Sequence, residues 1–311
     1  MHIIHDLENF NAPWDSSVIT LGVFDGMHRG HQTLVRRLQK RSRRANRARV
    51  LVTYHPHPDQ VLGKKNSPRP QEIFTYEEKL ALLQQFELDA VVFLPFTLEL
   101  ARMTALRYLK DILLGKLKAK HIIIGYDQCF GRGRKGNYKF LKQMSRRYEY
   151  KVDRLKAVRY KRKIISSSYI RILLEKGDIR TTNRLLGHSY FACGTVIRGF
   201  QRGAELGYPT ANLEFSEHKL LPAQGTYACL AEYGAELYRA MVNIGVNPTF
   251  GQDTLSVEAH ILDFDKTIYG EQVRLYFKER LRDEIKFDSV DELKAQLARD
   301  HAGTAKLKLK L

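Results

Sequence analysis

Apolar runs alternate with helical patterns along the first half of the chain. The runs lie within the segments SVITLGVFDG, RVLVTYHPHP, DAVVFLPF and KHIIIGYD, and the first three are each followed by apolar residues at helical spacing. Nearly continuous apolar strands separated by helices are typical of a doubly wound parallel sheet with both faces covered. Because ligands bind such sheets at the carboxyl ends of the strands, side chains that follow the strands are the first candidates for a site.

The pattern changes after about residue 186. Short alternating runs broken by Gly, Pro and Asn turns follow, which predicts an antiparallel barrel or sandwich. A last helix is expected in SVDELKAQLARD, with Ser289 as its N-cap and Glu292 at the capping-box position. We therefore predict an N-terminal domain at 1–186 and a C-terminal domain at 187–311.

Composition narrows the class of protein. The 311 residues contain no apolar run long enough to cross a membrane and no leader pattern, so we expect a soluble, unprocessed cytoplasmic protein without a membrane partner. Three widely spaced cysteines without a CxxC motif indicate neither a disulfide framework nor a zinc site. The 52 Lys and Arg against 34 Asp and Glu give a net charge of +18. Such a surplus attracts polyanions, either nucleic acid or phosphorylated small molecules.

Much of the charge surplus lies in Arg36–Arg49, which continues a helix that begins near His31. We interpret this run as a solvated helix face, since charge alone specifies no ligand. No nucleic-acid module is evident, and we expect the single tryptophan, Trp14, to pack in the interior rather than to stack on bases. No nucleic-acid partner is therefore expected. An RNA-binding regulatory protein is kept as a remote alternative, to be recognised by the salt dependence of its binding.

The segment GVFDGMHRGHQTLV carries the first chemical signal. It places His28 and His31 three residues apart, after a glycine turn and at the start of the expected helix. A helix N-terminus offers unpaired N–H groups and a partial positive charge, which favour an anion. Gly26 and Gly30 let a phosphate approach the backbone, and the two imidazoles share one face of the first turn. The pattern predicts two histidines that grip a triphosphate and stabilise the charge that develops during transfer.

Four segments of the first domain resemble the motifs of one family, in the family's order. GVFDGMHRGH resembles the GxFDGxHxGH signature of the bacterial FAD synthetases, which are HxGH nucleotidyltransferases. TYHPHP is similar to their TFEPHP segment, IIIGYDQCFGRGRKGN to GxDFxFGxxRxG, and IISSSYIR to ISSTxIR. The resemblance implies a domain that uses ATP and Mg²⁺ to adenylylate FMN, with His57 on the flavin side. The ATP-binding residues that it implies are Gly22, Phe24, Asp25, Gly26, His28, Gly30, His31, Asp127, Ser166, Ser167, Ser168 and Arg171.

The chemistry of these residue types agrees with that reaction. An FMN phosphate oxygen attacks the α-phosphorus of ATP and pyrophosphate leaves, so the protein positions the groups and stabilises charge without a covalent nucleophile. Hydroxyls and the Arg171 guanidinium donate hydrogen bonds to phosphate oxygens. The sequence departs from the family at His55, which replaces Glu or Asp, at Gln128, which replaces Phe, and at Ser168, which replaces Thr. Because His55 and Gln128 bear on how the flavin is held, an adenylyltransferase that is lost or redirected to another phosphorylated acceptor is kept as an alternative.

The second domain carries a signature of its own. By composition, GTVIRGFQRGAELGYPTANL is a hairpin with a flexible loop. It resembles the riboflavin kinase signature GxVxxGxxxGRxLGxPTAN, with Ala204 in the place of Arg, and the resemblance continues to the C-terminal helix. It implies a six-stranded barrel that phosphorylates riboflavin. The ATP-binding residues that it implies are Gly199, Gly203, Gly207, Pro209, Thr210 and Asn212.

The same resemblance implies a division of roles in the second domain. Thr210 and Asn212 hold Mg²⁺ through oxygen atoms, which that ion prefers. Glu258 takes the proton of the riboflavin 5′-hydroxyl as a general base, and Arg282 helps to position the flavin. The chain is thus expected to make FMN from riboflavin in one domain and FAD from FMN in the other. Its expected catalytic residues are Glu258, His28 and His31; no oligomeric state is predicted.

Overall fold

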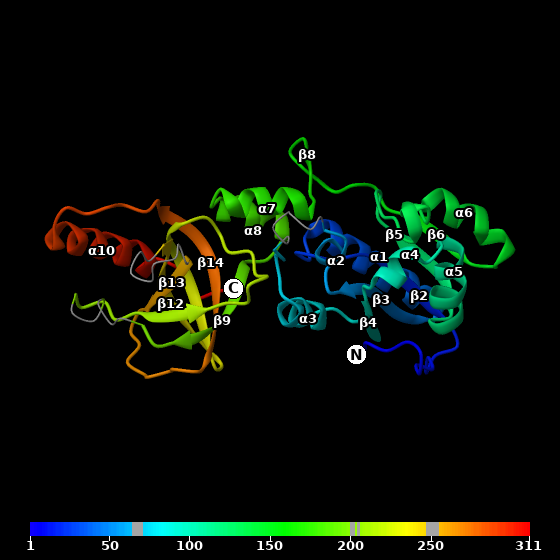
Figure 1. Ribbon diagram of the computed structural model, residues 1–311, viewed down its shortest axis with the longest axis horizontal. Helices are drawn as coiled ribbons and strands as arrows, with labels where there is room; N and C mark the ends of the chain where they lie inside the picture. Colours follow the sequence, from blue (N-terminus) through cyan, green and yellow to red (C-terminus); the bar gives the residue numbers. More distant parts are fainter. Residues whose placement is uncertain (64–70, 200–202, 204–205, 247–254) are drawn as a thin grey trace. The chain divides into compact units, whose positions relative to one another are not determined.

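Two compact units make up the chain in the computed structural model (Figure 1). The structure describes residues 1–63, 71–199, 203, 206–246 and 255–311. Unit 1 comprises Met1–Glu72 and Tyr76–Ser166, and unit 2 comprises Ile73–Thr75 and Ser167–Leu311. Ala204 lies outside the described residues.

A six-stranded parallel sheet is the centre of unit 1. The strands lie in the order β1-β4-β3-β2-β5-β6, and every neighbouring pair is parallel, which confirms the predicted Rossmann-like sheet. The order reverses between β2 and β5, and the carboxyl ends of the two strands at such a reversal flank a crevice suited to a ligand. The strands are β1 (His2–Ile4), β2 (Ser17–Leu21), β3 (Ala48–His55), β4 (Ala90–Pro95), β5 (Ala119–Ile124) and β6 (Lys151–Arg154).

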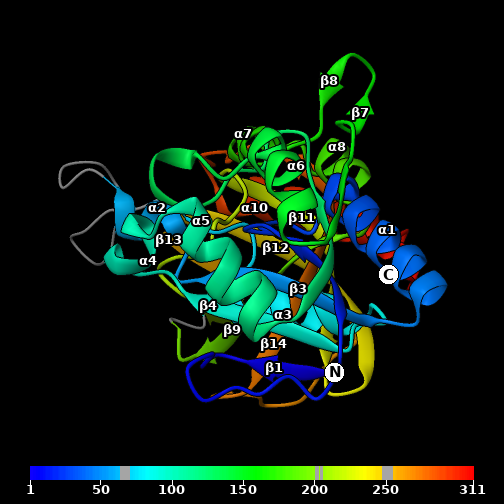
Figure 2. The same cartoon turned by 90° about the vertical axis from the view of Figure 1, so that its right-hand side faces the viewer.

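Helices cover both faces of this sheet. Helix α1 packs against β2, β3 and β5 (Figure 2), and its Leu34, Val35 and Leu38 are buried as their spacing predicts. A core cluster on the other face joins Ile19 of β2 to Leu109 of the π-helix η1. The remaining elements of unit 1 are α1 (Arg29–Ala45), α2 (Pro58–Leu62), α3 (Tyr76–Gln84), α4 (Leu98–Arg102), α5 (Ala105–Arg107), η1 (Tyr108–Lys116), the 3-10 helix η2 (Arg132–Arg134), α6 (Tyr138–Arg147), β7 (Arg159–Tyr160) and β8 (Lys163–Ile164).

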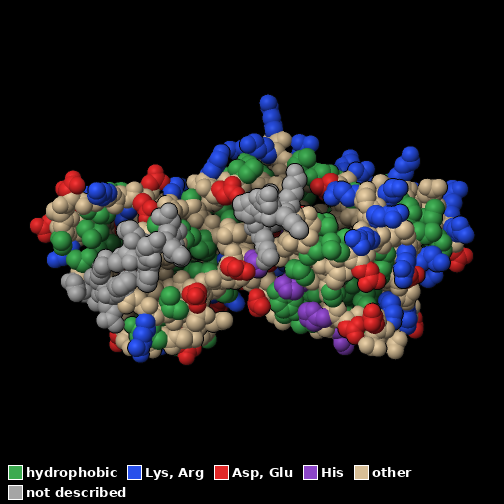
Figure 3. Space-filling view, viewed as in Figure 1, with side chains coloured by type: hydrophobic (Ala, Val, Ile, Leu, Met, Phe, Trp, Pro, Cys, Tyr) green, Lys and Arg blue, Asp and Glu red, His purple; other side chains and the backbone are tan. Residues whose placement is uncertain are grey.

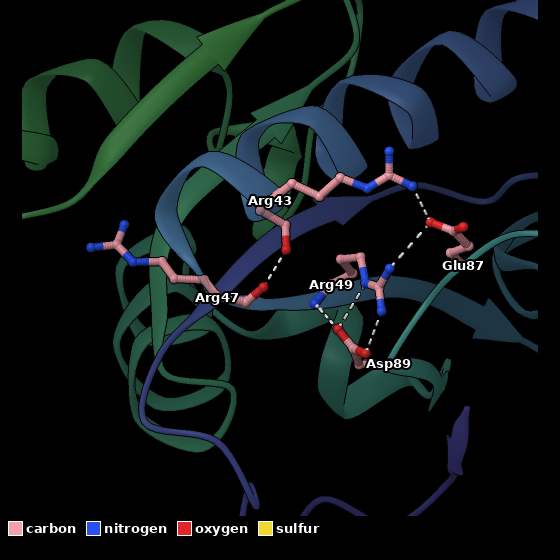
Figure 4. A network of polar contacts seen from close by, with 6 residues as sticks. Arg43, Arg47, Arg49, Glu87 and Asp89 are labelled. Atoms are coloured by element: carbon pink, nitrogen blue, oxygen red, sulfur yellow. Dashed lines mark hydrogen bonds and ion pairs between the residues drawn. The ribbon is translucent and has the colours of Figure 1, made fainter.

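The charge surplus belongs entirely to unit 1. Residues 1–166 contain 33 Lys and Arg against 15 Asp and Glu, whereas residues 167–311 contain 19 of each. On the face shown in Figure 3, the Lys and Arg side chains gather mostly over unit 1. Part of the basic run is paired, because Arg43 contacts Glu87 and Arg49 forms a two-pronged pair with Asp89 (Figure 4).

Unit 2 is a closed antiparallel barrel with flanking helices. Its strands lie in the order β10-β13-β12-β11-β14-β9, which confirms the expected six-stranded barrel and excludes the sandwich. The strands are β9 (Tyr190–Ile197), β10 (Ala211–Glu214), β11 (Gly225–Tyr233), β12 (Glu236–Val246), β13 (Leu255–Ile261) and β14 (Gln272–Arg282), and the helices are α7 (Ser167–Glu175), α8 (Ile179–Leu186) and α10 (Val290–Ala305).

Helices α7 and α8, which we expected in the N-terminal domain, belong to unit 2 by their contacts. The reason lies in α8, whose Asn183 donates from its side-chain amide to the Phe277 carbonyl at 2.8 Å and accepts from the Tyr190 backbone N–H at 2.7 Å. The compact units therefore divide after Ser166, and the predicted domain boundary after residue 186 stays a prediction.

Candidate active sites

A buried turn follows β2 at the point where the strand order reverses. Backbone φ is positive at Phe24, at Gly26 and at Met27, three residues out of four. Phe24 and Met27 are both fully buried, so surrounding packing holds a conformation that side chains ordinarily avoid. The Thr53 hydroxyl donates to the Val23 carbonyl at 2.8 Å and so ties the turn to β3. The turn delivers the next residues to the start of α1 in one geometry.

His28 is the N-cap of α1. Its Nδ1 accepts a hydrogen bond from the His31 backbone N–H at 3.3 Å, so in the neutral ring the proton is on Nε2. The two imidazole rings stack with centroids 3.6 Å apart. A Cβ on Gly30 would lie 2.9 Å from Cε1 of His28, so the glycine makes room for the imidazole. Packing against His28 therefore requires a glycine at position 30, in addition to the expected close approach of a phosphate.

His31 lies beside His28 as a neutral base. Burial is the main cause that holds its pKa well below the ordinary value, and the nearby His28 and Lys79 add to the effect. Its Nδ1 is buried and has no hydrogen-bond partner among the residues that the structure describes. A buried polar atom without a partner is costly, and a bound ligand can satisfy it.

Two neighbouring strand ends bring further predicted residues toward this turn. After β5, the Gln128 side chain reaches Gly22, because a Cβ on that glycine would lie 3.5 Å from Gln128 Oε1. Asp127 directly precedes Gln128. After β3, the buried His57 caps α2 by accepting from the Asp59 backbone N–H at 3.2 Å. Because β3 and β5 flank β2 in the parallel sheet, these two strand ends lie at the same edge as the turn, and the grouping of Asp127 and His57 with the two histidines stays a prediction.

The serine motif spans the point in the sequence at which unit 1 ends and unit 2 continues. Ser166 is the last residue of unit 1, whereas Ser167, Ser168 and Arg171 lie in the first half of α7 and belong to unit 2. Their grouping with the two histidines around ATP stays a prediction.

Three predicted residues of unit 2 meet at two adjacent strands, β10 and β13, with Thr210 directly before β10. Glu258 of β13 stands opposite Asn212 of β10 and opposite Asn243 of β12 in the barrel register. The Thr210 hydroxyl donates to Glu258 Oε2 at 3.3 Å. A Cβ on Gly199 would overlap the Asn212 amide, so this glycine makes room for the side chain. A hydroxyl, an amide oxygen and a carboxylate in one place form an oxygen donor set that fits Mg²⁺.

These side chains face a cavity of about 300 Å³. Its polar wall contains Thr210, Asn212, Asn243 and Glu258, and its apolar wall comes largely from the segment after β14 and from α10. Sequence reasoning did not name Asn243 or the apolar wall, although the segment that forms this wall lies within the part of the chain that resembles riboflavin kinase. The lining residues are Gly203, Leu206, Tyr208, Thr210, Asn212, Thr226, Met241, Asn243, Glu258, His260, Arg282, Glu284, Ile285, Phe287, Leu293 and Leu297.

A second hollow of about 170 Å³ is also lined by Thr210. It is largely apolar, with Lys266 and Tyr269 at its wall, and among the described residues Thr210 alone lines both hollows. Two ligands could therefore meet at the Thr210 hydroxyl, next to Glu258.

Arg282 lines the large cavity while its guanidinium is engaged elsewhere. Its Nε lies 2.8 Å from Asp300 Oδ2, and both side chains are buried or nearly so. Gln296 donates to the other carboxylate oxygen of Asp300 at 2.9 Å. Arg282 thus fastens α10 to β14, and its predicted contact with a flavin stays a prediction.

In the described part of the chain, no cluster of three or more His, Cys, Asp or Glu side chains has metal-binding geometry. Nor does any described helix combine the length and apolar character that a membrane span requires. The three cysteines, Cys129, Cys193 and Cys229, are free thiols.

Comparisons with known proteins match both units. The family model for FAD synthetase matches residues 11–169, and that for riboflavin kinase matches residues 186–308. The bifunctional riboflavin kinase/FMN adenylyltransferase of Bacillus subtilis is 32% identical over 305 residues, covering 96% of this chain and 95% of that protein. Its namesake from Escherichia coli strain K12 is 31% identical over 302 residues, covering 96% of both.

One solved structure has the same fold as this protein over nearly the whole chain. The crystal structure titled as a macrolide-efflux protein from Streptococcus pneumoniae is 32% identical, with a TM-score of 0.90 over 98% of this chain and 99% of that one. The efflux activity in that title has no counterpart in the two family matches. With both family matches in the expected order and relatives aligned from end to end, the chain belongs to the bifunctional riboflavin kinase/FMN adenylyltransferase family.

Proposed function

We propose that unit 2 phosphorylates riboflavin to FMN and that unit 1 adenylylates FMN to FAD, each with ATP and with the residues named above. The observation that carries this proposal is that each unit has a separate site of its own. One site has His28 and His31 stacked at the strand reversal, and the other has Thr210 and Glu258 joined at the junction of two hollows. A cytoplasmic location and small-molecule substrates without nucleic acid are part of the proposal.

In the kinase reaction, Glu258 accepts the proton of the riboflavin 5′-hydroxyl as that oxygen attacks the γ-phosphorus of ATP. The bond from the γ-phosphorus to the bridging oxygen breaks, and ADP leaves. The large cavity, with its wall of Ile285, Phe287 and Leu297, suits the flavin ring, and the smaller hollow suits the nucleotide. Thr210 and Asn212 would hold Mg²⁺, which when bound offsets the phosphate charge. Because Thr210 lines both hollows, the reacting oxygen and phosphorus meet within reach of the Glu258 carboxylate.

In the adenylyl transfer, the two histidines hold the triphosphate so that the FMN phosphate attacks the α-phosphorus in line. The half-buried His31 is held neutral and presents an unsatisfied Nδ1, and the Nδ1 of His28 accepts from the His31 backbone N–H. Fixed hydrogen-bonding groups in a water-poor site stabilise developing charge without rearranging during the reaction. We assign His57, which is buried after β3, to the part of the site that binds the flavin.

Separation of flavins after incubation with riboflavin, ATP and Mg²⁺ tests the proposal. The purified chain should form FMN and then FAD; accumulation of FMN without FAD would instead indicate an adenylyltransferase that is lost or redirected. His28→Ala should stop FAD formation and spare FMN formation, and Glu258→Ala should do the converse when FMN is supplied. His2→Ala and Glu271→Ala, at exposed positions of the same two units, are matched controls and should retain both activities.

A further inference from the structure

Lys79 is a lysine in the interior of unit 1 that neither motif includes. It lies on α3 and is only 2% exposed. No hydrogen bond or ion pair of its ammonium group is found among the described residues, and its Nζ is not among the wholly enclosed polar atoms. Lysines are almost never fully buried unless they are paired, because an unpaired buried charge is strongly unfavourable. We therefore expect the ammonium group of Lys79 to bind an anionic ligand.

The histidines of the site lie around this lysine. The positive charge of Lys79 lowers the pKa of His31 and, together with burial as the largest cause in each case, that of His55. Geometry agrees, because Tyr76, one turn before Lys79 on α3, contacts the His55 ring with centroids 5.1 Å apart. Lys79 is thus near His31, which follows β2, and near His55, which ends β3. Those two residues lie on the nucleotide side and the flavin side of the proposed site.

The buried, unpaired Nδ1 of His31 is a second observation that points to a ligand at this place. A cation whose charge acts on His31, together with the unsatisfied ring nitrogen of that residue, matches an anion with several oxygen atoms. The adenylyl transfer must bring two anionic phosphates together, and their repulsion opposes the approach. A fixed cation between them is the group that would offset this repulsion.

We propose that Lys79 is a catalytic residue of unit 1 whose ammonium group contacts the phosphate of FMN as it attacks ATP. The bond that forms joins an FMN phosphate oxygen to the α-phosphorus, and the bond that breaks joins the α-phosphorus to the oxygen of the leaving pyrophosphate. Lys79 transfers no proton and acts by charge alone. The inference rests on the proposed function, since it needs FMN and ATP to meet beside His31.

The test compares Lys79→Met with Lys142→Met, which removes an exposed lysine from α6 of the same unit. Loss of a charged contact to phosphate should lower kcat/KM for FAD formation from FMN by about 10- to 100-fold in Lys79→Met. The control should match the wild type, and both variants should form FMN at the wild-type rate. If the wild type itself makes no FAD, the proposed function fails; if it makes FAD and Lys79→Met stays within about twofold of it, the inference about Lys79 fails.

Thermal unfolding separates this role from a structural one. Because Lys79→Met replaces an unpaired buried charge with an apolar side chain, its Tm should equal or exceed that of the wild type. A lower Tm would assign Lys79 to the fold and overturn the proposal. Lys79→Arg keeps the charge and should form FAD at least about tenfold faster than Lys79→Met; equal rates in the two variants would also overturn it.

Discussion

The buried ion pair between Arg282 and Asp300 should contribute measurably to the free energy of unfolding of unit 2. The two groups are 2.8 Å apart, and their side chains are 15% and 5% exposed. Removing one partner of such a pair costs about 3–5 kcal/mol, because the other is left charged and buried. Asp300→Ala should therefore lower the free energy of unfolding of unit 2 by about that amount. It should also raise KM for riboflavin, because α10 contributes Leu293 and Leu297 to the cavity wall.

The chain contains its own internal control for this measurement. Its single tryptophan, Trp14, lies in unit 1, where the indole N–H donates to the Leu117 carbonyl at 3.2 Å. Tryptophan fluorescence during urea unfolding therefore follows unit 1, and riboflavin kinase activity at each urea concentration follows unit 2. Asp300→Ala should shift the second transition and leave the first unchanged.

A matched double variant tests the electrostatic reasoning itself. Arg282→Met with Asp300→Leu replaces the pair with apolar side chains, so no charge is left stranded, and it should recover most of the stability lost in Asp300→Ala. A loss below about 1 kcal/mol in Asp300→Ala, or an equal shift of the Trp14 transition, would refute the reasoning.

Three further outcomes are expected. Lys219→Met should destabilise unit 2 by about 2–4 kcal/mol in urea unfolding, because the buried ammonium donates to two backbone carbonyls and lies over aromatic rings. Arg43→Ala should cost less than about 0.5 kcal/mol, because its pair with Glu87 is exposed, whereas Arg49→Ala should cost about 1–2 kcal/mol through loss of its two-pronged pair (Figure 4). The pKa of His31 is depressed in the folded chain, so below about pH 6.5 the unfolded chain binds a proton at this imidazole and the folded chain does not. The free energy of unfolding should therefore decrease as the pH falls below that value. The decrease should be less steep in His31→Gln, which cannot bind this proton.

Local sequence patterns predicted the main strands and helices and the histidine pair of the first site, whereas the residues of the second site came from the family resemblance. The apolar runs predicted the parallel strands, and the spacing of Leu34 and Leu38 predicted the buried face of α1. The position of His28 and His31 after a glycine turn predicted two rings on one helix start, and they are stacked there. Such features depend on residues within a few positions of one another, so periodicity and turn chemistry reveal them.

Other features were decided only when distant segments came together. Strand order placed the reversal between β2 and β5, and barrel closure brought Thr210 to Glu258, 48 residues away. The partner of Arg282 was equally hidden, because it lies on a helix that packs back on the barrel. Lys79 stands in a helix whose pattern marks it as an ordinary charged position, and only packing shows that it is buried beside the histidines. The sequence by itself determined the main strands and helices and the residue types that could bind phosphate. Tertiary structure decided which of them meet, because register, closure and burial depend on the packing of the whole chain.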